Sequence, residues 1–338
     1  MYPFESDPVY QEIEALVTST YGLWDEMRQG FSWRNYYMNH TRRVLTLSCQ
    51  MGEDSGADVK QLAYAAILHD ITKRFDGEIK RDESGQAILN EEGFWLNQTV
   101  SPARANWVTE AYDRLNLHGQ IHHVSGATMT ELVLREFGLE RSFIRPVAKI
   151  VRGHLKGKVP AEVFEERYRE PEVRLLYDAD TIDPNVGYTA FYRNIQINAG
   201  RAAQKGVTID LRDYIATLPR WVNSKDQFYQ HMLTERAREV CADRQARNRA
   251  TMAALNEELE DFELNRRYGL LGVVEHLLTN PEDPSLREHA RALSEEWLPE
   301  REKALAAEAE FDRDLAGEAL QRARTFSKTL NAEIAGAQ

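Results

Sequence analysis

The sequence predicts an all-α fold. Apolar residues recur at helical spacing along nearly all of the 338 residues, and the alternating pattern of half-buried strands is almost absent. A chain of this length can bury a substantial core, so we expect one large domain, alone or with an appendage.

Three helices are expected near the N-terminus. Residues 8–20 and 39–51 carry apolar side chains at helical spacing, and His40 falls in the first turn of the second segment. Residues 58–69 are rich in alanine, and Asp58 stands in the N-cap position, where its carboxylate can accept from a free backbone N–H.

Three more helices are expected in the middle of the chain. Residues 125–137 form a strong helical pattern that ends at a glycine. Residues 146–154 are expected to start at Pro146, which is tolerated in the first turn because its missing N–H would be unpaired there. Residues 171–182 complete the group.

The C-terminal part is also expected to be helical. Residues 224–264 read as one long helix rich in Arg and Glu. Residues 285–330 follow, interrupted at Trp297-Leu298-Pro299.

A charged, glycine-containing stretch at about 76–120 predicts an insertion, with a small hairpin as one form it could take. We expect a domain over residues 1–264 that includes this insertion, and a helical extension over residues 265–338. The insertion contains Phe94, Trp95, Arg104 and Trp107. Its aromatic residues could stack on a base or sugar, although aromatic residues in an insertion more often form a small core of their own.

Composition narrows the class of protein. The net charge of -12 disfavours nucleic acid and anionic membranes as partners, and the arginines between residues 236 and 249 alternate with acidic residues, as on a solvated face. The two cysteines, Cys49 and Cys241, are expected to be free and buried. Without an apolar run of spanning length or a signal-peptide pattern, a cytoplasmic location is expected.

Six residues of metal-ligand type stand in helical contexts, and imidazole and carboxylate are ligands of iron, manganese and zinc. A single site needs about three or four protein ligands, so six ligands with one bridging carboxylate suit two adjacent metal ions. Asp70 is the natural bridge. The set is His40, His69, Asp70, His122, His154 and Asp180.

The contexts of these residues resemble the motifs of the HD-domain metalloenzymes, an all-helical superfamily of mostly phosphohydrolases. The matching stretches are NHTRRV (39–44), AAILHDITK (65–73), IHHVSGA (121–127), IVRGHLKG (150–157) and YDADTIDP (177–184). They look most like the di-iron members that hydrolyse symmetrical dinucleoside tetraphosphates. They are also similar to the HD-GYP phosphodiesterases, but the GYP element is absent.

This resemblance implies a metal-dependent phosphohydrolase that cleaves a nucleotide or another small phosphoester or phosphoanhydride. A hydroxide bridging two ions, iron or Mn²⁺, would attack phosphorus. One ion would be held by His40, His69, Asp70 and Asp180. The other would be held by His122, His154 and the bridging Asp70.

The resemblance also suggests catalytic roles. Asp70 would orient the nucleophile, Lys73 would meet a substrate phosphate, and Arg152 is a candidate phosphate clamp because guanidinium binds phosphate with two hydrogen bonds. A surface position for Lys73 and a surface salt bridge for Arg152 are the alternatives.

Other residues could take the place of some of these ligands. His118 and His123 compete with His122, which we prefer because it stands four residues before Gly126, as in the family pattern. His123 is then expected beside the ligands or in the pocket.

Near the C-terminal ligand, Asp178 and Asp183 compete with Asp180. Residues two apart on a helix point to different faces, so only one of Asp178 and Asp180 can be a ligand.

Two other functions share this ligand set: a mixed-valent di-iron oxygenase and a non-catalytic metal-binding scaffold. The insertion and the C-terminal helices depart from the compact tetraphosphatases, so they leave the substrate open. A homodimer formed through the C-terminal helices is an alternative to their packing within one chain.

Overall fold

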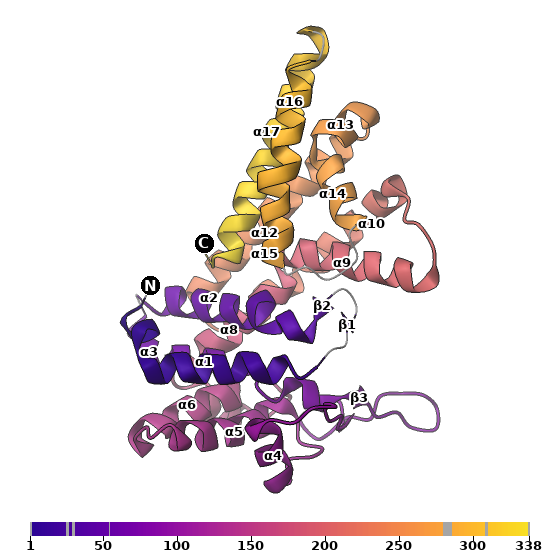
Figure 1. Cartoon of the computed structure of the whole chain (residues 1–338). Coiled ribbons are helices and arrows are strands. Elements are labelled where there is room, and N and C mark those ends of the chain that lie inside the picture. The colour runs from indigo at the N-terminus through magenta and orange to yellow at the C-terminus, as the bar shows by residue number, and fades with distance from the viewer. Residues whose placement is uncertain are drawn as a thin grey trace. The chain divides into compact units, whose positions relative to one another are not determined.

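The computed structural model describes residues 2–24, 27–28, 31–53, 55–279, 286–307 and 310–336. The all-α prediction is confirmed, because helices dominate these residues (Figure 1). Their only paired strands are two short antiparallel pairs, β1 (Met27–Arg28) with β2 (Phe31–Ser32) and β3 (Glu78–Ile79) with β4 (Asn97–Gln98).

The chain divides into two compact units. Unit 1 comprises residues 1–26 and 33–180, and unit 2 comprises residues 27–32 and 181–338. The domain boundary expected near residue 264 stays a prediction.

Unit 1 is a helical bundle around one buried helix. Its elements are η1 (Pro3–Ser6), α1 (Pro8–Tyr21), η2 (Trp33–Asn35), η3 (Tyr37–Thr41), α2 (Arg42–Gly52), α3 (Val59–Leu68), η4 (Lys73–Asp76), α4 (Trp107–Arg114), α5 (His122–Glu136), α6 (Arg141–Gly153), α7 (Ala161–Arg167) and most of α8 (Pro171–Asn185). Helix α3 contacts α1, α2, α5 and α6, and its residues from Leu62 to Leu68 are all buried. Helix α3 therefore lies in the middle of the bundle.

Capping explains where α3 begins. The Asp58 carboxylate accepts from the backbone N–H of Gln61 at 3.0 Å, as the sequence predicts. The side chains that follow are small or apolar, and such a helix can be packed on all sides.

Helices α5 and α6 begin earlier than expected. Helix α5 starts at His122 instead of residue 125, and α6 starts at Arg141 instead of Pro146. Pro146 lies inside α6, where burial of Ile144 and Val147 on the same helix outweighs one lost backbone hydrogen bond.

His40 also lies in a different local structure from the one expected. It belongs to η3, a π-helical turn that runs directly into α2. Such turns insert one extra residue per turn and are frequent at functional sites.

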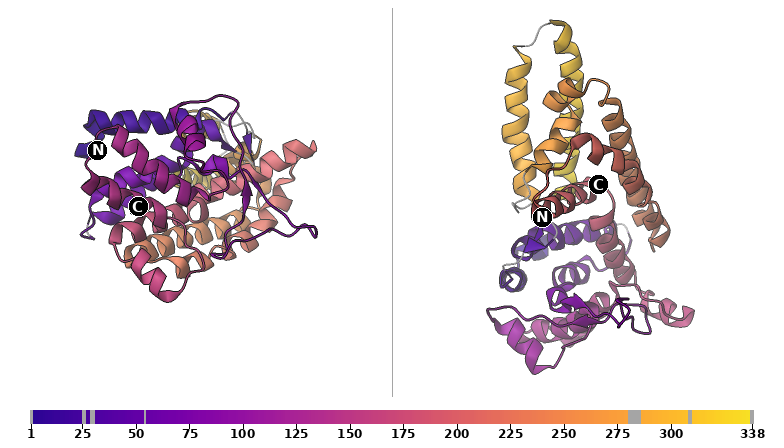
Figure 2. Two further views of the ribbon diagram at one scale, coloured as in Figure 1. Left: turned by 90° about the horizontal axis from the view of Figure 1, so that it is seen from below. Right: turned by 90° about the vertical axis from the view of Figure 1, so that its right-hand side faces the viewer.

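Unit 2 has its own core. Its helices are the end of α8, α9 (Tyr188–Lys205), α10 (Leu211–Asn223), α11 (Gln227–His231), α12 (Glu235–Glu257), α13 (Phe262–Tyr268), α14 (Leu270–Leu278), α15 (Leu286–Ala292), η5 (Leu293–Trp297), α16 (Leu298–Leu305) and α17 (Glu310–Ile334). Phe191, Leu271 and Leu320 are fully buried together in one apolar cluster. Figure 2 shows α16 and α17 lying side by side, in agreement with their contacts.

The single helix expected over residues 224–264 is wrong. The segment forms α11, α12 and α13, because Met232 is extended and Thr234 caps a new helix by accepting from the N–H of Ala237 at 3.2 Å. The expected start at residue 285 lies outside the described residues. The expected interruption at residues 297–299 is a π-helical turn leading into α16.

Two further predictions concern single features. Cys49 and Cys241 are free and buried, as expected. In the part of the chain that the structure describes, no helix combines the length and the apolar character needed to cross a bilayer.

Candidate metal centre

The buried carboxylate of Asp70 is the centre of the candidate site. It stands two residues after the end of α3 and has no solvent exposure. Its Oδ2 lies 3.5 Å from Nε2 of His40 and 3.2 Å from Nε2 of His69. Its Oδ1 lies 3.4 Å from Nε2 of His122 and 3.5 Å from Nε2 of His154. Each oxygen therefore faces a different pair of imidazoles.

Asp180, on α8, completes the first of these groups. Its Oδ1 lies 3.0 Å from Nε2 of His40 and 3.6 Å from Nε2 of His69. The structure thus brings together two sets of ligand-type atoms that could hold metal ions. They are His40, His69, Asp70 and Asp180, and Asp70, His122 and His154.

The first turn of α5 is tied to the end of α3. The hydroxyl of Thr72 donates to the carbonyl oxygen of His122 at 3.2 Å and lies 2.8 Å from the hydroxyl of Ser125. A Cβ atom at Gly126 would lie 3.2 Å from the carbonyl oxygen of His69. A small residue at this position lets α5 approach closely enough to place His122 beside Asp70.

Hydrogen bonds at Nδ1 orient three of the imidazoles. Nδ1 of His69 lies 2.6 Å from the carbonyl oxygen of Ala66, and Nδ1 of His154 lies 2.6 Å from that of Val151. A carbonyl oxygen only accepts, so these Nδ1 atoms each carry a proton, and Nε2 is the nitrogen that could bind a metal ion.

A carboxylate orients the third imidazole. Nδ1 of His122 lies 2.5 Å from Oδ2 of Asp76, at the end of η4. A ligand histidine commonly donates its second N–H in this way, which fixes the ring and raises the basicity of the free nitrogen.

The donor set fits a metal ion. Nε2 of His69, His122 and His154, and Oδ1 of Asp70, are buried and have no hydrogen-bond partner. A buried polar atom without a partner costs free energy, and a cation bound by these lone pairs would remove that cost. Nitrogen and carboxylate oxygen donors without thiolate suit iron, manganese or zinc.

Electrostatics keep the carboxylates ionised. Burial alone would raise the pKa of Asp70, but the nearby His69, Lys73, His154 and His40 hold it well below its usual value. Burial also opposes ionisation of Asp180, and the nearby imidazoles of His40 and His69, together with Lys73, hold its pKa well below the ordinary range.

The surroundings shift the pKa values of His69 and His123 in opposite directions. Burial would lower the pKa of His69, but Asp70 and Asp180 outweigh it and raise the pKa to about 9. Burial and the neighbouring His154 lower the pKa of His123 to about 2. His123 is therefore a neutral imidazole beside the ligand set.

The alternative ligand candidates are not members of the two ligand groups. His118 is paired with Asp113 at 3.1 Å, away from the ligand groups. His123 is buried and its ring lies 6.4 Å from that of His154, as expected of a residue adjoining the ligands. Among the described residues, neither Asp178 nor Asp183 joins a ligand group.

The two expected phosphate contacts differ in position. Nζ of Lys73 lies 2.8 Å from Oδ2 of Asp70, directly at the centre. Arg152 is half-buried on α6 and interacts electrostatically with Arg167 and Glu92.

Two residues were missed by sequence reasoning. Tyr36 donates its hydroxyl to Oδ2 of Asp70 at 2.8 Å, and Asp76 orients His122. The spacing of Tyr36 four residues before His40 is a helical signal that could have indicated the first. Asp76 has no such signal, because a turn separates it from α3.

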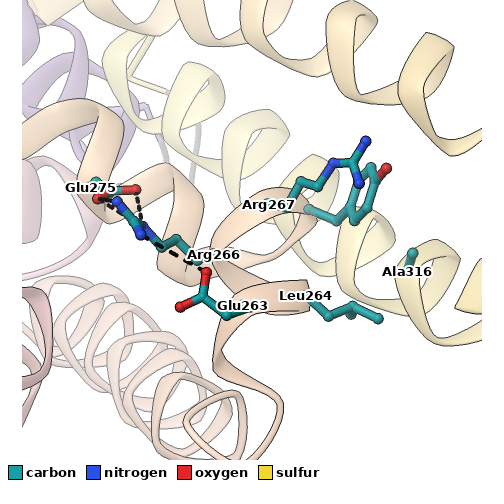
Figure 3. Close-up of a pocket in the computed structure, with 7 residues that line it drawn as sticks. Glu263, Leu264, Arg266, Arg267, Glu275 and Ala316 are labelled. Atoms are coloured by element: carbon teal, nitrogen blue, oxygen red, sulfur yellow. Dashed lines mark hydrogen bonds and ion pairs between the residues drawn. The ribbon is translucent and has the colours of Figure 1, made fainter.

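Unit 2 contains a separate cavity of about 610 Å³. It is lined by Glu263, Leu264, Arg266, Arg267, Tyr268, Glu275 and Ala316 (Figure 3). Arg266 is held by both carboxylate oxygens of Glu275, at 2.9 and 2.8 Å from its Nε. Its charge is therefore compensated, and the cavity offers no group of histidines.

Neither a curated protein nor a solved structure matches the chain. Residues 37–185 match the family model described as the HD domain. This segment contains every residue of the two ligand groups. Residues 37–185 are thus similar to the HD domain, and the buried His and Asp groups that could hold metal ions lie within this segment.

Proposed function

We propose that this protein is a metal-dependent phosphohydrolase that acts on a nucleotide or another small phosphoester or phosphoanhydride. We propose further that it binds two metal ions, of iron or manganese. Asp70 would be shared between them, His40, His69 and Asp180 would complete one set of ligands, and His122 and His154 the other.

One observation supports this proposal most strongly. The two oxygens of the Asp70 carboxylate face two different pairs of Nε2 atoms, all at 3.2–3.5 Å. A carboxylate in this position is suited to bridging two cations. Two adjacent cations would supply Lewis-acid stabilisation of the attacking and leaving oxygens and a nucleophile near neutral pH.

The chain's own residues would provide orientation and charge. Lys73 is partly exposed and holds its ammonium group beside Asp70, where it can stabilise negative charge on phosphoryl oxygens. Tyr36 fixes the same carboxylate oxygen through its hydroxyl group. Asp76 and the backbone carbonyls of α3 and α6 hold the imidazole rings before any substrate arrives.

The test is metal analysis of anaerobically purified protein, followed by a panel of phosphoesters and nucleotides assayed with Fe²⁺ and Mn²⁺. We expect about two ions per chain for the wild type and about one for His122→Ala. Asp70→Ala should lose both the metal and the activity.

His118→Ala is the matched control, because His118 is an imidazole of unit 1 outside the ligand groups. It should retain both metal and activity. Unchanged metal content in Asp70→Ala and His122→Ala would refute the ligand assignment. Oxygen consumption without phosphate release would favour an oxygenase, and bound metal without either reaction would favour a scaffold.

A further inference from the structure

The insertion forms an arm that reaches His123 and the loop after His154. The arm, residues 77–98, makes an exposed turn at 82–86 and an inner turn at 90–94. In the inner turn, the carbonyl oxygen of Glu92 accepts from the N–H of Lys158 at 2.7 Å. The ring of Phe94 lies 4.9 Å from the ring of His123. Trp95, by contrast, is 57% exposed, so the arm's aromatic residues do not form a core of their own.

The loop after His154 is shaped to receive this turn. A Cβ atom at Gly157 would lie 2.7 Å from Cε2 of Phe94 and 2.9 Å from Oε2 of Glu92. Any residue with a Cβ atom at this position would displace the side chains of Phe94 and Glu92 from their present places. The inner turn is therefore docked at a defined position.

The docked turn places a carboxylate against the guanidinium group of Arg167. Glu92 accepts from Nη1 and Nη2 of Arg167 at 3.1 and 3.2 Å, in a two-pronged ion pair. Arg152 interacts electrostatically with both of these residues. One carboxylate is thus hydrogen-bonded to Arg167 and also interacts electrostatically with Arg152.

The arginine pair is close to the candidate metal centre. Arg152 stands in the last turn of α6, two residues before His154. Arg167 is hydrogen-bonded to Glu92 in the same inner turn as Phe94, whose ring lies 4.9 Å from that of His123, next to His122 in the sequence. A substrate with one phosphoryl group at the centre could place a second anionic group beside these arginines.

We propose that Arg152 and Arg167 form a second anion subsite for the substrate, and that Glu92 of the arm occupies this subsite as an internal competitor. The inference rests on the proposed function and narrows its substrates to those with a phosphate or another oxyanion beyond the reacting phosphoryl group. A phosphate carries more charge and more acceptor oxygens than a carboxylate, so it can displace Glu92. The side chains of Glu92 and Arg167 are 29% and 15% exposed, so their ion pair is open to exchange with a ligand.

Binding of inorganic phosphate to the metal-free protein tests this subsite without any contribution from the metals. Titration calorimetry should show phosphate binding about tenfold more tightly to Glu92→Gln than to the wild type, because the competing closed state is removed. The double variant Glu92→Gln/Arg167→Gln should not show this increase in phosphate affinity. Glu91→Gln, which makes the same charge change at an exposed neighbouring position, should bind phosphate as the wild type does.

Hydrogen exchange provides a second measurement. Phosphate added to the metal-free wild type should increase amide exchange over residues 90–96, because it releases the inner turn. Equal phosphate affinity of Glu92→Gln and Glu91→Gln would overturn the proposal. So would tighter phosphate binding that persists when Arg167→Gln is added to Glu92→Gln, or unchanged amide exchange over residues 90–96 when phosphate is added. These results do not depend on metal content or turnover, so they are distinguishable from failure of the proposed function.

Discussion

At the residue scale, the arrangement around Asp70 depends on neighbours that hold the ligand atoms in place. Asp76 is such a neighbour, because it contacts His122 through Nδ1 and leaves Nε2 directed at Asp70. Side chains in this position tune metal affinity without touching the metal.

Asp76→Asn should therefore weaken metal binding by about 10- to 100-fold, the usual range for such partners. Metal titration of the apo protein would measure the change. Asp113→Asn removes the partner of the exposed His118 and is the matched control. Equal affinities in the two variants would contradict a role for Asp76 in orienting His122.

The pKa of His69 predicts how the metal-free protein responds to pH. This pKa is raised from 6.5 to about 9 by Asp70 and Asp180, which outweigh burial. A group whose pKa rises on folding contributes its full stability below pH 6.5 and loses that contribution as the pH approaches 9.

The free energy of unfolding, measured with urea in the presence of a chelator, should therefore fall between pH 6.5 and 9. The contribution of His69 to the slope is at most about 1.4 kcal/mol per pH unit. His69→Asn should lack this contribution. Parallel pH profiles for the two proteins would show that His69 does not carry the raised pKa.

The six ligand-type residues chosen from the sequence come together in the structure, but the sequence did not reveal the residues that orient them. His40, His69 and Asp70 are recognisable because their chemistry demands particular residue types in particular motifs. Tyr36 and Asp76 reach the site through hydrogen bonds that depend on how η3 and η4 turn, and no spacing rule specifies those turns.

At the scale of elements, the packing of α6 against α8 positions His154. A Cβ atom at Gly153 would lie 2.3 Å from Cγ1 of Val173. The close contact between the two helices therefore requires a glycine directly before the ligand-type histidine.

Gly153→Ala should force α6 and α8 apart, lower stability by about 1–3 kcal/mol and reduce metal retention. Val173→Ala added to this variant should restore much of both, because it removes the clashing methyl group. Gly317→Ala, where a Cβ atom meets nothing within 4 Å, is the control. Chemical denaturation and metal analysis would measure the effects, and a failure of the second substitution to rescue would exclude this clash as the cause.

Helix existence was predictable from periodicity, but helix ends were not. The period of apolar residues does not reveal that Pro146 lies inside α6, because the proline is tolerated only through the packing of its neighbours. The break before α12 depends on the Thr234 cap and on the extended backbone of Met232. The sequence around it is rich in Arg and Glu, which favour helix, so the pattern alone does not indicate the break.

At the scale of the whole molecule, two separate cores make stability a property of each unit. All the ligand-type residues lie in unit 1, whereas Phe191, Leu271 and Leu320 belong to the core of unit 2. Sequence patterns predicted an appendage but not this division, because it depends on which buried faces contact one another.

Metal binding should therefore stabilise unit 1 selectively. Mn²⁺ at 100 times its dissociation constant would add about 2.7 kcal/mol to the unit that binds it. Hydrogen exchange should show increased protection in α3, α5 and α6 and unchanged protection in α14 and α17. Asp70→Ala should abolish the effect, and equal protection of both units would contradict it.

The single carboxylate shared by two groups of imidazoles has a thermodynamic consequence. A cation held on one oxygen of Asp70 withdraws negative charge from the other, so occupancy of one group would change the affinity of the second. Such coupling is reciprocal, whichever group is loaded first. If both groups bind an ion, as proposed, the protein would show two successive binding constants, and a half-loaded species could accept a different metal at its second group.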